Sequence, residues 1–209
     1  VSVEEDSGPY SQVVISNVSP GPADESGQSV AFEIAELTGS QAALFAVPPT
    51  ISPEGVLQFT TAAHQNTGKN GPVVLSVTAR DSEGAVSDAV DVSISVSEVN
   101  DAPIAIADTL SASDEDTIIL LPESTLLDND IDPDLFTNDS EFLKVILGGD
   151  SSAFGAMIEL SATTGQITYD PTLSLTLQSL KPGESVNDFF TYRAVDAAGL
   201  QSGLATVSL

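Results

Sequence analysis

The stretch Val73-Val74-Leu75-Ser76-Val77-Thr78-Ala79-Arg80 is typical of a β-strand with one buried face. Its apolar residues recur at every second position, and successive side chains of a strand point to opposite faces of the sheet. Similar alternations, rich in Val, Ile, Thr and Phe, recur along the chain and are separated by Gly, Pro, Asn and Asp roughly every 8–15 residues. This pattern predicts an all-β fold built from β-sandwiches.

The same pattern gives the positions of the expected strands. In the first half they cover residues 13–18, 30–36, 57–61, 73–80 and 90–99. In the second half they cover residues 117–121, 142–147, 157–160, 167–169, 189–195 and 204–209. Helical periodicity is weak throughout the chain, so strands are the expected elements.

The sequence also repeats itself. Three pairs of segments match in the same order: 4–7 with 114–117, 55–59 with 165–169, and 77–81 with 192–196. Their offsets are all roughly 110 residues, which is the size of a small domain. We therefore expect two tandem Greek-key β-sandwiches, covering residues 1–101 and 102–209, with almost no linker between them. Pro103, close to this boundary, disfavours a strand that continues across it.

Composition excludes several classes of function. The 209 residues include 31 Asp and Glu but only 5 Lys and Arg, so the formal net charge is −26. Such a chain repels nucleic acid and anionic membranes, because phosphate binding needs Lys and Arg. The absence of Cys excludes disulfides and zinc thiolate sites. No apolar run reaches the roughly 18 residues of a membrane span. We expect that the protein is not an enzyme, because its acids lie in predicted loops and it has few aromatic residues.

Six carboxylates with no Lys or Arg among them lie close together in the sequence: Asp128, Asp130, Asp132, Asp134, Asp139 and Glu141. Two carboxylates 4 Å apart repel each other by about 4 kcal/mol at an effective dielectric constant of 20. Such a loop must extend into water, have raised pKa values or bind a cation. Oxygen ligands without Cys or His favour calcium over zinc or copper, and calcium accepts the irregular geometry of a loop. A solvated acidic turn without an ion is the alternative.

A Greek-key sandwich would bring distant acidic segments together. In the second domain, the loop 128–134 and Asp196 should lie at the end where the chain enters, next to the pair Asn100-Asp101. In the first domain, the turn with the pair Glu5-Asp6 should lie at the end where the chain leaves that domain, which faces the junction. We therefore expect the four segments to meet at the interdomain junction.

These motifs resemble those of the cadherin-like and VCBS-type immunoglobulin-like tandem repeats of large bacterial adhesins and secreted proteins. In the first domain the matching motifs are Glu5-Asp6-Ser7, Gly21-Pro22-Ala23-Asp24-Glu25, Gly27-Gln28, Gly55 before Phe59, and Val99-Asn100-Asp101-Ala102-Pro103. In the second they are Asp114-Glu115-Asp116-Thr117, Leu127-Asp128-Asn129-Asp130, Asp132-Pro133-Asp134, Gly183-Glu184-Ser185, and Phe190-Thr191-Tyr192 before Asp196. The resemblance covers nearly the whole chain and depends on the order and spacing of these motifs.

In that family calcium at domain junctions stiffens the chain. The resemblance therefore implies Ca²⁺ ligands among Glu5, Asn100, Asp101, Asp128, Asp130 and Asp196. With the other acids of the expected junction, the full set of predicted metal ligands is Glu5, Asp6, Asn100, Asp101, Asp128, Asp130, Asp132, Asp134 and Asp196. The turn 62–71 departs from the family pattern because it has no carboxylate, so fewer ions are expected than in animal cadherins.

Together these features predict a calcium-rigidified spacer or adhesion segment of a large bacterial protein, located outside the cell or on its surface. The first residues look like the interior of a longer chain, so adjacent like domains are expected partners. The main alternative is a carbohydrate- or partner-binding module of a secreted hydrolase or adhesin, whose partner would be a polysaccharide or a cell-surface protein. Direct homophilic adhesion is a second alternative. Tyr169 and Tyr192 alternate with apolar residues, which indicates core packing rather than sugar stacking.

Overall fold

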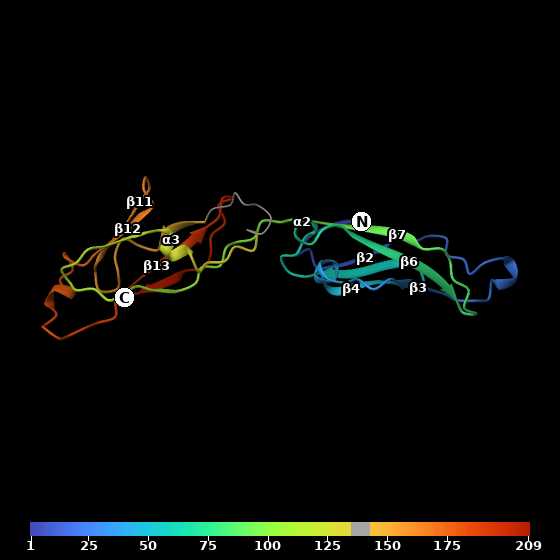
Figure 1. Ribbon diagram of the computed structural model, residues 1–209, viewed down its shortest axis with the longest axis horizontal. Helices are drawn as coiled ribbons and strands as arrows, with labels where there is room; N and C mark the ends of the chain where they lie inside the picture. The colour runs from blue at the N-terminus through green and yellow to red at the C-terminus, as the bar shows by residue number, and fades with distance from the viewer. Residues whose placement is uncertain (135–142) are drawn as a thin grey trace. The chain divides into compact units, whose positions relative to one another are not determined.

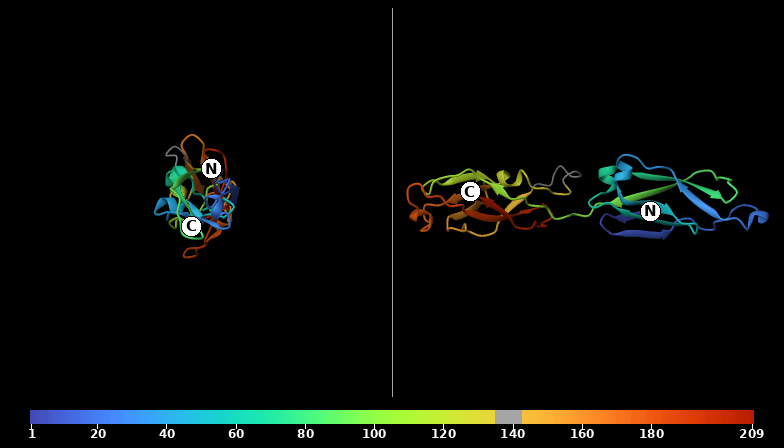
Figure 2. Two further views of the ribbon diagram at one scale, coloured as in Figure 1. Left: turned by 90° about the vertical axis from the view of Figure 1, so that its right-hand side faces the viewer. Right: turned by 90° about the horizontal axis from the view of Figure 1, so that it is seen from below.

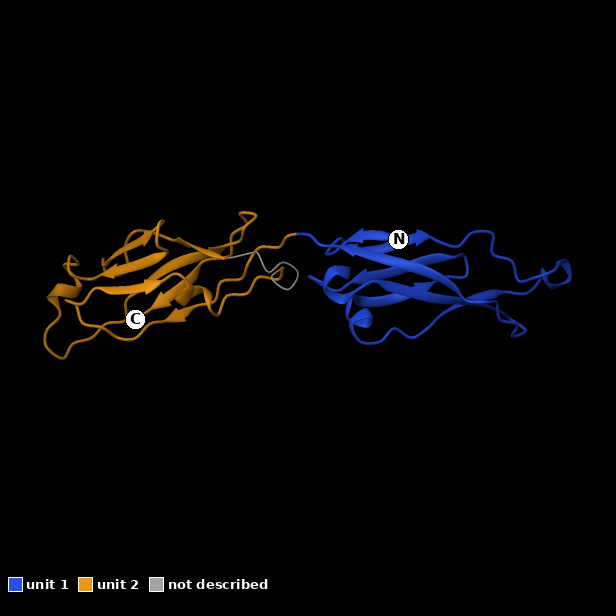
Figure 3. Ribbon diagram, turned by 45° about the horizontal axis from the view of Figure 1, so that its top comes forward, with its two compact units in different colours: residues 1–99 blue, residues 100–209 orange. Residues whose placement is uncertain are grey.

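The computed structural model describes residues 1–134 and 143–209. It consists of two compact units, Val1–Val99 and Asn100–Leu209 (Figure 3). The division falls two residues before the boundary expected from the sequence, so the pair Asn100-Asp101 belongs to the second unit. Residues 128–134 are called the acidic loop. Asp139 and Glu141, which follow this loop, and the beginning of the expected strand 142–147 lie outside the described residues.

The first unit contains two sheets. Its strands are β1 (Ser2–Glu4), β2 (Pro9–Val13), β3 (Val30–Ile34), β4 (Phe45–Ile51), β5 (Val56–Thr61), β6 (Val73–Asp81) and β7 (Val90–Ser97). One sheet has the order β1-β7-β6-β3 and the other the order β2-β5-β4. Figure 1 labels β2, β3, β4, β6 and β7 of this unit. β1 pairs with β7 in parallel, and the other pairs are antiparallel. The connections include the short helices η1 (Ala23–Glu25), α1 (Ser40–Ala43) and α2 (Thr67–Asn70).

The second unit repeats this architecture. Its described strands are β8 (Asp108–Thr109), β9 (Ile119–Pro122), β10 (Lys144–Leu147), β11 (Met157–Ser161), β12 (Gln166–Asp170), β13 (Phe189–Val195) and β14 (Ala205–Ser208). They form sheets of order β10-β13-β14-β8 and β11-β12-β9. The short helices are α3 (Ser124–Leu127) and η2 (Leu177–Ser179). Within residues 1–134 and 143–209, no helix is long and apolar enough to cross a lipid bilayer.

Strand for strand, the two units have the same topology. The order β1-β7-β6-β3 corresponds to β8-β14-β13-β10, and β2-β5-β4 corresponds to β9-β12-β11. The short first strand of each unit also pairs in parallel with the last strand, β1 with β7 and β8 with β14. The expectation of an all-β fold with a repeated sandwich is thus confirmed.

The core of each unit lies between its two sheets. In the first unit Leu57 of β5 belongs to the same buried cluster as Val73 of β6 and Ile94 of β7. In the second unit Ile167 of β12 is in one cluster with Tyr192 of β13. Because each cluster joins strands of different sheets, the sheets pack face to face, and each unit shows two layers of strands (Figure 2). Tyr192 is therefore a core residue, as expected.

The expected strand 13–18 is wrong except at its first residue, because β2 ends at Val13. The N–H groups of Val14 and Ile15 both donate to the carbonyl oxygen of Gly55, at 3.0 and 3.2 Å, which takes the chain out of the ladder. Asn17 then has a φ of 56°, a left-handed conformation that ends an extended run.

Three strands, β1, β4 and β8, have no counterpart among the expected ones. β4 contains Pro48 and Pro49, and proline disfavours a strand because it cannot donate a ladder hydrogen bond. The register with β5 shifts between Phe45 and Val47 and again between Val47 and Thr50, and these irregularities accommodate the prolines at the edge of the sheet.

Gly55 is required where β5 begins. Its φ is 81°, and a Cβ atom at this position would lie 2.1 Å from the carbonyl oxygen of Ile15. Only glycine combines the left-handed backbone with this close approach. The repeated motif has Gly165 at the equivalent turn before β12, with a φ of 64°.

Candidate metal centre

In the second unit, the first two residues are hydrogen-bonded to acidic side chains from distant loops. The side-chain amide of Asn100 donates to Oδ2 of Asp196 at 2.8 Å. The backbone N–H of Asp101 donates to Oδ2 of Asp134 at 2.7 Å. Two segments that are widely separated in the sequence thus meet at the start of this unit, as the Greek-key argument predicts.

A tight turn places Asp132 and Asp134 side by side. The N–H of Asp134 donates to Oδ1 of Asp132 at 2.9 Å, which is a side-chain turn of the kind that Asp often forms. Just before this turn, Ile131 and Ile104 exchange two backbone hydrogen bonds, at 2.7 and 3.0 Å. This short bridge fixes the loop against the beginning of the unit.

Asp196 is held by the hairpin turn that follows β13. Its Oδ1 accepts the N–H of Leu200 at 2.8 Å, and its backbone carbonyl accepts the N–H of Gly199 at 3.2 Å. With Oδ1 used by the turn, Oδ2 faces Asn100. The turn therefore fixes the direction of the carboxylate.

Burial and like charge act together on Asp132. Its side chain is only 2% exposed, and its Oδ2 has no hydrogen-bond partner among the described residues. Burial raises the pKa of the Asp132 carboxyl, the N–H of Asp134 opposes this, and the nearby carboxylates of Asp134, Asp196 and Asp101 raise the pKa further. Three further carboxylates are therefore close enough to Asp132 to disfavour its charged form.

These residues fit a hard cation. The atoms available as metal ligands are all oxygens, and no Lys or Arg occurs in the sequence between Asp101 and Asp134. A buried carboxylate oxygen without a donor is costly unless it is protonated or paired with a cation. Ca²⁺ binds six to eight oxygen ligands, including carboxylates and carbonyls, in flexible geometry.

The first unit has a second buried carboxylate. Glu5 is 2% exposed, and its Oε1 accepts the N–H of Val99 at 3.0 Å and the amide of Asn66 at 3.2 Å. Its Oε2 is buried and has no hydrogen-bond partner within the described part of the chain. Asn66 is itself fixed as the N-cap of α2, because its Oδ1 accepts the N–H of Lys69 at 3.0 Å.

Asp6 lies next to Glu5 but is exposed. Its carboxylate oxygens both lie 3.4 Å from the N–H of His64, and its Oδ2 lies 3.6 Å from Nδ1 of the same residue. His64, whose side chain is partly exposed, thus contacts a predicted ligand.

The other two predicted ligands in the second unit are Asp128 and Asp130. Asp128 is exposed at the end of α3, and no hydrogen bond ties it to another predicted ligand in the described residues. Asp130 accepts the Tyr192 hydroxyl at 2.9 and 3.1 Å and the N–H of Ile106 at 2.8 Å. Burial raises the pKa of the Asp130 carboxyl, and these hydrogen bonds oppose the rise.

Sequence reasoning missed the roles of Asn66, Asp108 and Tyr192. Asn66 has no charge that would mark it as a neighbour of Glu5. Asp108 lies beside Asp130 and Tyr192, and burial raises the pKa of its carboxyl. The alternation of Tyr192 with apolar residues predicted only that its side chain is buried. A buried phenol also needs a hydrogen-bond acceptor, and the nearby acids supply several.

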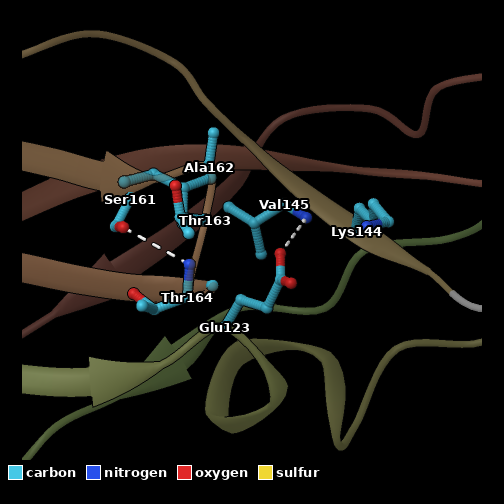
Figure 4. A pocket seen from close by; sticks show the side chains of 9 residues that line it. Glu123, Lys144, Val145, Ser161, Ala162, Thr163 and Thr164 are labelled. Atoms are coloured by element: carbon cyan, nitrogen blue, oxygen red, sulfur yellow. Dashed lines mark hydrogen bonds between the residues drawn. The ribbon is translucent and has the colours of Figure 1, made fainter.

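A separate pocket of about 520 Å³ lies where the turn between β11 and β12 approaches Glu123 and Lys144 (Figure 4). The Glu123 carboxylate accepts the N–H of Val145 at 3.1 Å, and Ser161 accepts the N–H of Thr164 at 3.4 Å. None of the predicted ligands is among its described lining residues. The pocket is therefore not part of the acidic cluster.

Exposed aromatic side chains are few among the residues that the structure describes. Among the Phe and Tyr residues that it describes, Phe189 is the one with a largely exposed side chain, at 47%. Tyr169 and Tyr192 are buried, and Tyr10 stacks on Phe59 with ring centroids 4.8 Å apart. The described residues thus form no row of exposed aromatic rings, which is the feature that would favour carbohydrate binding.

Comparison with solved structures finds chains that include a desmocollin and a protocadherin ectodomain. The chain is similar to human desmocollin-1 (16% identity, TM-score 0.47, 86% of this chain and 33% of that chain) and to human CDH23 EC21-23 (18%, 0.46, 100% and 65%). It is also similar to the protocadherin GammaB4 extracellular domain (14%, 0.44, 99% and 32%). The chain thus spans about a third of the first and third of these chains and about two-thirds of the second.

No curated protein matches the chain. A protein-family model does match: the model described as Bacterial Ig domain covers residues 100–209, the whole of the second unit and more than half of the sequence. This agrees with the expected resemblance to immunoglobulin-like repeats of bacterial proteins. The chain belongs to the bacterial Ig domain family.

Proposed function

We propose that this chain is a calcium-binding tandem segment of a bacterial protein located outside the cell or on its surface, where it acts as a spacer that calcium makes rigid. One observation carries the proposal. Asp132 has a buried carboxylate oxygen without a hydrogen-bond partner among the described residues, close to three further carboxylates. A cation bound there would supply the missing partner and remove the repulsion.

The ligands proposed for this ion are the side chains of Asp132, Asp134, Asp196 and Asp101, with the side-chain carbonyl of Asn100. A carboxylate-rich site that lacks Cys and His selects against zinc and copper. Magnesium demands near-ideal octahedral geometry, which a site assembled from three loops meets less easily than calcium's irregular shell. Glu5 supports a further ligand position in the first unit, with Asp6 as its exposed neighbour.

The spacer role rests on the residues that connect the units. Val99, Asn100 and Asp101 are consecutive, and each is hydrogen-bonded to a carboxylate of its own unit: Glu5, Asp196 and Asp134, respectively. An ion bound to Asp134 and Asp196 would restrain the residues that these carboxylates hold. The connecting backbone would then lose conformational freedom, which is how binding energy is converted into stiffness.

Location outside the cell agrees with the bacterial Ig domain family and with calcium availability. Extracellular calcium modules bind at roughly 10⁻⁴–10⁻³ M, which suits a site whose loops are partly exposed. A net charge of −26 keeps such a chain soluble and discourages contact between copies in the absence of calcium. A binding and mechanical role, rather than catalysis, is the function that we propose.

The proposal is tested by calorimetric titration of the whole chain with CaCl₂ and with MgCl₂. We expect saturable calcium binding that magnesium does not reproduce at the same concentration. Asp132→Asn should weaken calcium binding by at least about tenfold, or 1.4 kcal/mol. Asp150→Asn makes the same change in net charge at an exposed position and should leave the affinity unchanged. Equal effects of the two substitutions would mean that only the general negative field attracts calcium.

A further inference from the structure

The hydroxyl group of Tyr192 joins three segments of the second unit. Tyr192 lies on β13, and its side chain is fully buried. Its oxygen lies 2.8 Å from the carbonyl oxygen of Leu126, 3.1 Å from the carbonyl oxygen of Ile106, and 2.9 Å from Oδ1 of Asp130. These groups belong to α3, to the stretch before β8, and to the acidic loop.

Asp130 completes this connection. Its Oδ1 also accepts the N–H of Ile106 at 2.8 Å, and one residue further along the chain Ile131 and Ile104 form their double backbone hydrogen bond. The first half of the acidic loop is therefore fastened to residues 104–106 before the loop reaches Asp132. Since Asp132 follows Asp130 by two residues, the position of one constrains the position of the other.

The carboxylate of Asp130 is already used as an acceptor. Both of its oxygens lie within hydrogen-bond distance of the Tyr192 hydroxyl, and one of them also accepts a backbone N–H. Burial and the hydrogen bond to Asp130 raise the pKa of Tyr192, so the phenol keeps the proton that it donates. This use differs from that of Asp132, whose Oδ2 has no hydrogen-bond partner among the described residues.

We infer that Tyr192 and Asp130 are positioning residues that hold the acidic loop so that Asp132 and Asp134 can bind the cation together with Asp196. This inference rests on the proposed calcium site, and it makes Asp130 a positioning residue rather than a ligand. The hydroxyl of Tyr192 is the group that does this, because its single proton is donated to Asp130 while its oxygen lies 2.8 Å from the carbonyl oxygen of Leu126 in α3.

A matched control exists in the same unit. Tyr169 is also buried, at 3% exposure, and its hydroxyl also donates to a buried carboxylate, that of Asp188, at 2.8 Å. Tyr169→Phe and Tyr192→Phe therefore remove the same group from similar surroundings, but only the second contacts the acidic loop. Calorimetric titration with CaCl₂, well below the unfolding temperature, should show a roughly tenfold or greater loss of affinity in Tyr192→Phe. Tyr169→Phe should bind calcium like the unaltered chain.

Asp130→Asn distinguishes a positioning residue from a ligand. Asn keeps one oxygen that can accept the N–H of Ile106, so Asp130→Asn should weaken calcium binding clearly less than Asp132→Asn does. If Asp130→Asn instead weakens binding as much as Asp132→Asn, or if the two Tyr variants bind calcium equally well, the inference is overturned.

A readout without calcium separates this inference from the proposed function. Amide hydrogen exchange in calcium-free buffer should be faster at Ile131 and Asp134 in Tyr192→Phe than in Tyr169→Phe. If the unaltered chain fails to bind calcium, the proposed function is wrong. Faster exchange confined to the acidic loop would then still support the positioning role, and equal exchange in the two variants would refute it.

Discussion

Asn100 donates a hydrogen bond from its side-chain amide to Oδ2 of Asp196, at 2.8 Å, although 96 residues separate them. The first residue of the second unit is thereby fixed to the turn between β13 and β14. The neighbouring residue, Asp101, is fixed in the same way to Asp134. The start of the unit is therefore held by the same carboxylates that form the candidate metal centre.

Glu5→Gln should have opposite effects with and without calcium. Gln has the same shape as Glu but no charge, so the substitution removes a buried charge that has no partner. In calcium-free buffer the free energy of unfolding of the first unit should therefore be unchanged or higher. In calcium, the stabilisation that the ion gives to the unaltered chain should be smaller in this variant. Urea unfolding at both conditions measures this. Glu4→Gln, at the exposed neighbouring position, should behave like the unaltered chain in both buffers.

Without calcium, the second unit should become more stable as the pH falls from 7 toward 4. Burial raises the pKa of the Asp132 carboxyl above its ordinary value of 3.8, and burial also raises the pKa values of Asp108 and Asp130. Between the unfolded and folded pKa values the folded state binds more protons, so the free energy of unfolding increases as the pH decreases. Below about 3.8 both states are protonated and this gain stops.

Urea unfolding over this pH range measures the effect, and Asp132→Asn is the test variant. Its free energy of unfolding should change less steeply with pH than that of the unaltered chain, since the Asp132 carboxyl no longer contributes to the pH dependence. Asp150→Asn should keep the original slope. Identical slopes in all three proteins would show that Asp132 has no raised pKa in solution.

Asp188→Ala should destabilise the second unit by about 2–4 kcal/mol, without loss of any proposed ligand. The Asp188 carboxylate accepts hydrogen bonds from Tyr169, at 2.8 Å, from the N–H of Phe154, at 2.9 Å, and from the Ser152 hydroxyl. Its removal leaves two buried hydroxyl groups and a partly buried N–H without their acceptor. Thermal unfolding measures the loss. Asp150→Ala removes an exposed carboxylate and should change the stability by less than about 0.5 kcal/mol.

Calcium should narrow the distribution of distances between the two units. The chain has no Cys, so Val90→Cys and Leu175→Cys, at positions 65% and 90% exposed, allow one spin label in each unit. Pulsed electron paramagnetic resonance on the doubly labelled chain should give a broad distribution of distances between the labels in calcium-free buffer and a narrower one in calcium. The same labels on an Asp132→Asn background should remain broad. A distribution that calcium does not change would contradict the spacer role while leaving calcium binding intact.

The sequence predicted the fold well because alternation is a local property. Strands such as β6 and β13 have clean alternation and lie where expected. β4 was missed because Pro48 and Pro49 contradict strand chemistry, and only the structure shows that bulges accommodate them at a sheet edge. β1 and β8 are short, and their parallel pairing with a strand far away in sequence leaves no local signal.

The candidate site was predictable in composition but not in detail. The Greek-key argument brings Asp132, Asp134 and Asp196 to the beginning of the second unit, and the structure places them there. It does not separate Asp130 from Asp132, because both are Asp in the same loop. The distinction depends on Tyr192, whose hydroxyl reaches Asp130 across the core, and sequence periodicity does not encode such a contact.

The most direct test of the calcium account is thermal unfolding of the whole chain in calcium-free buffer, in CaCl₂ and in MgCl₂, with Asp132→Asn measured in parallel. A ligand that binds only the folded state at a hundred times its Kd stabilises that state by about 2.7 kcal/mol. We predict an increase in unfolding temperature with calcium that magnesium does not give and that Asp132→Asn largely abolishes. An unfolding temperature that calcium leaves unchanged, or that the two cations raise equally in both proteins, would contradict a specific calcium site at Asp132.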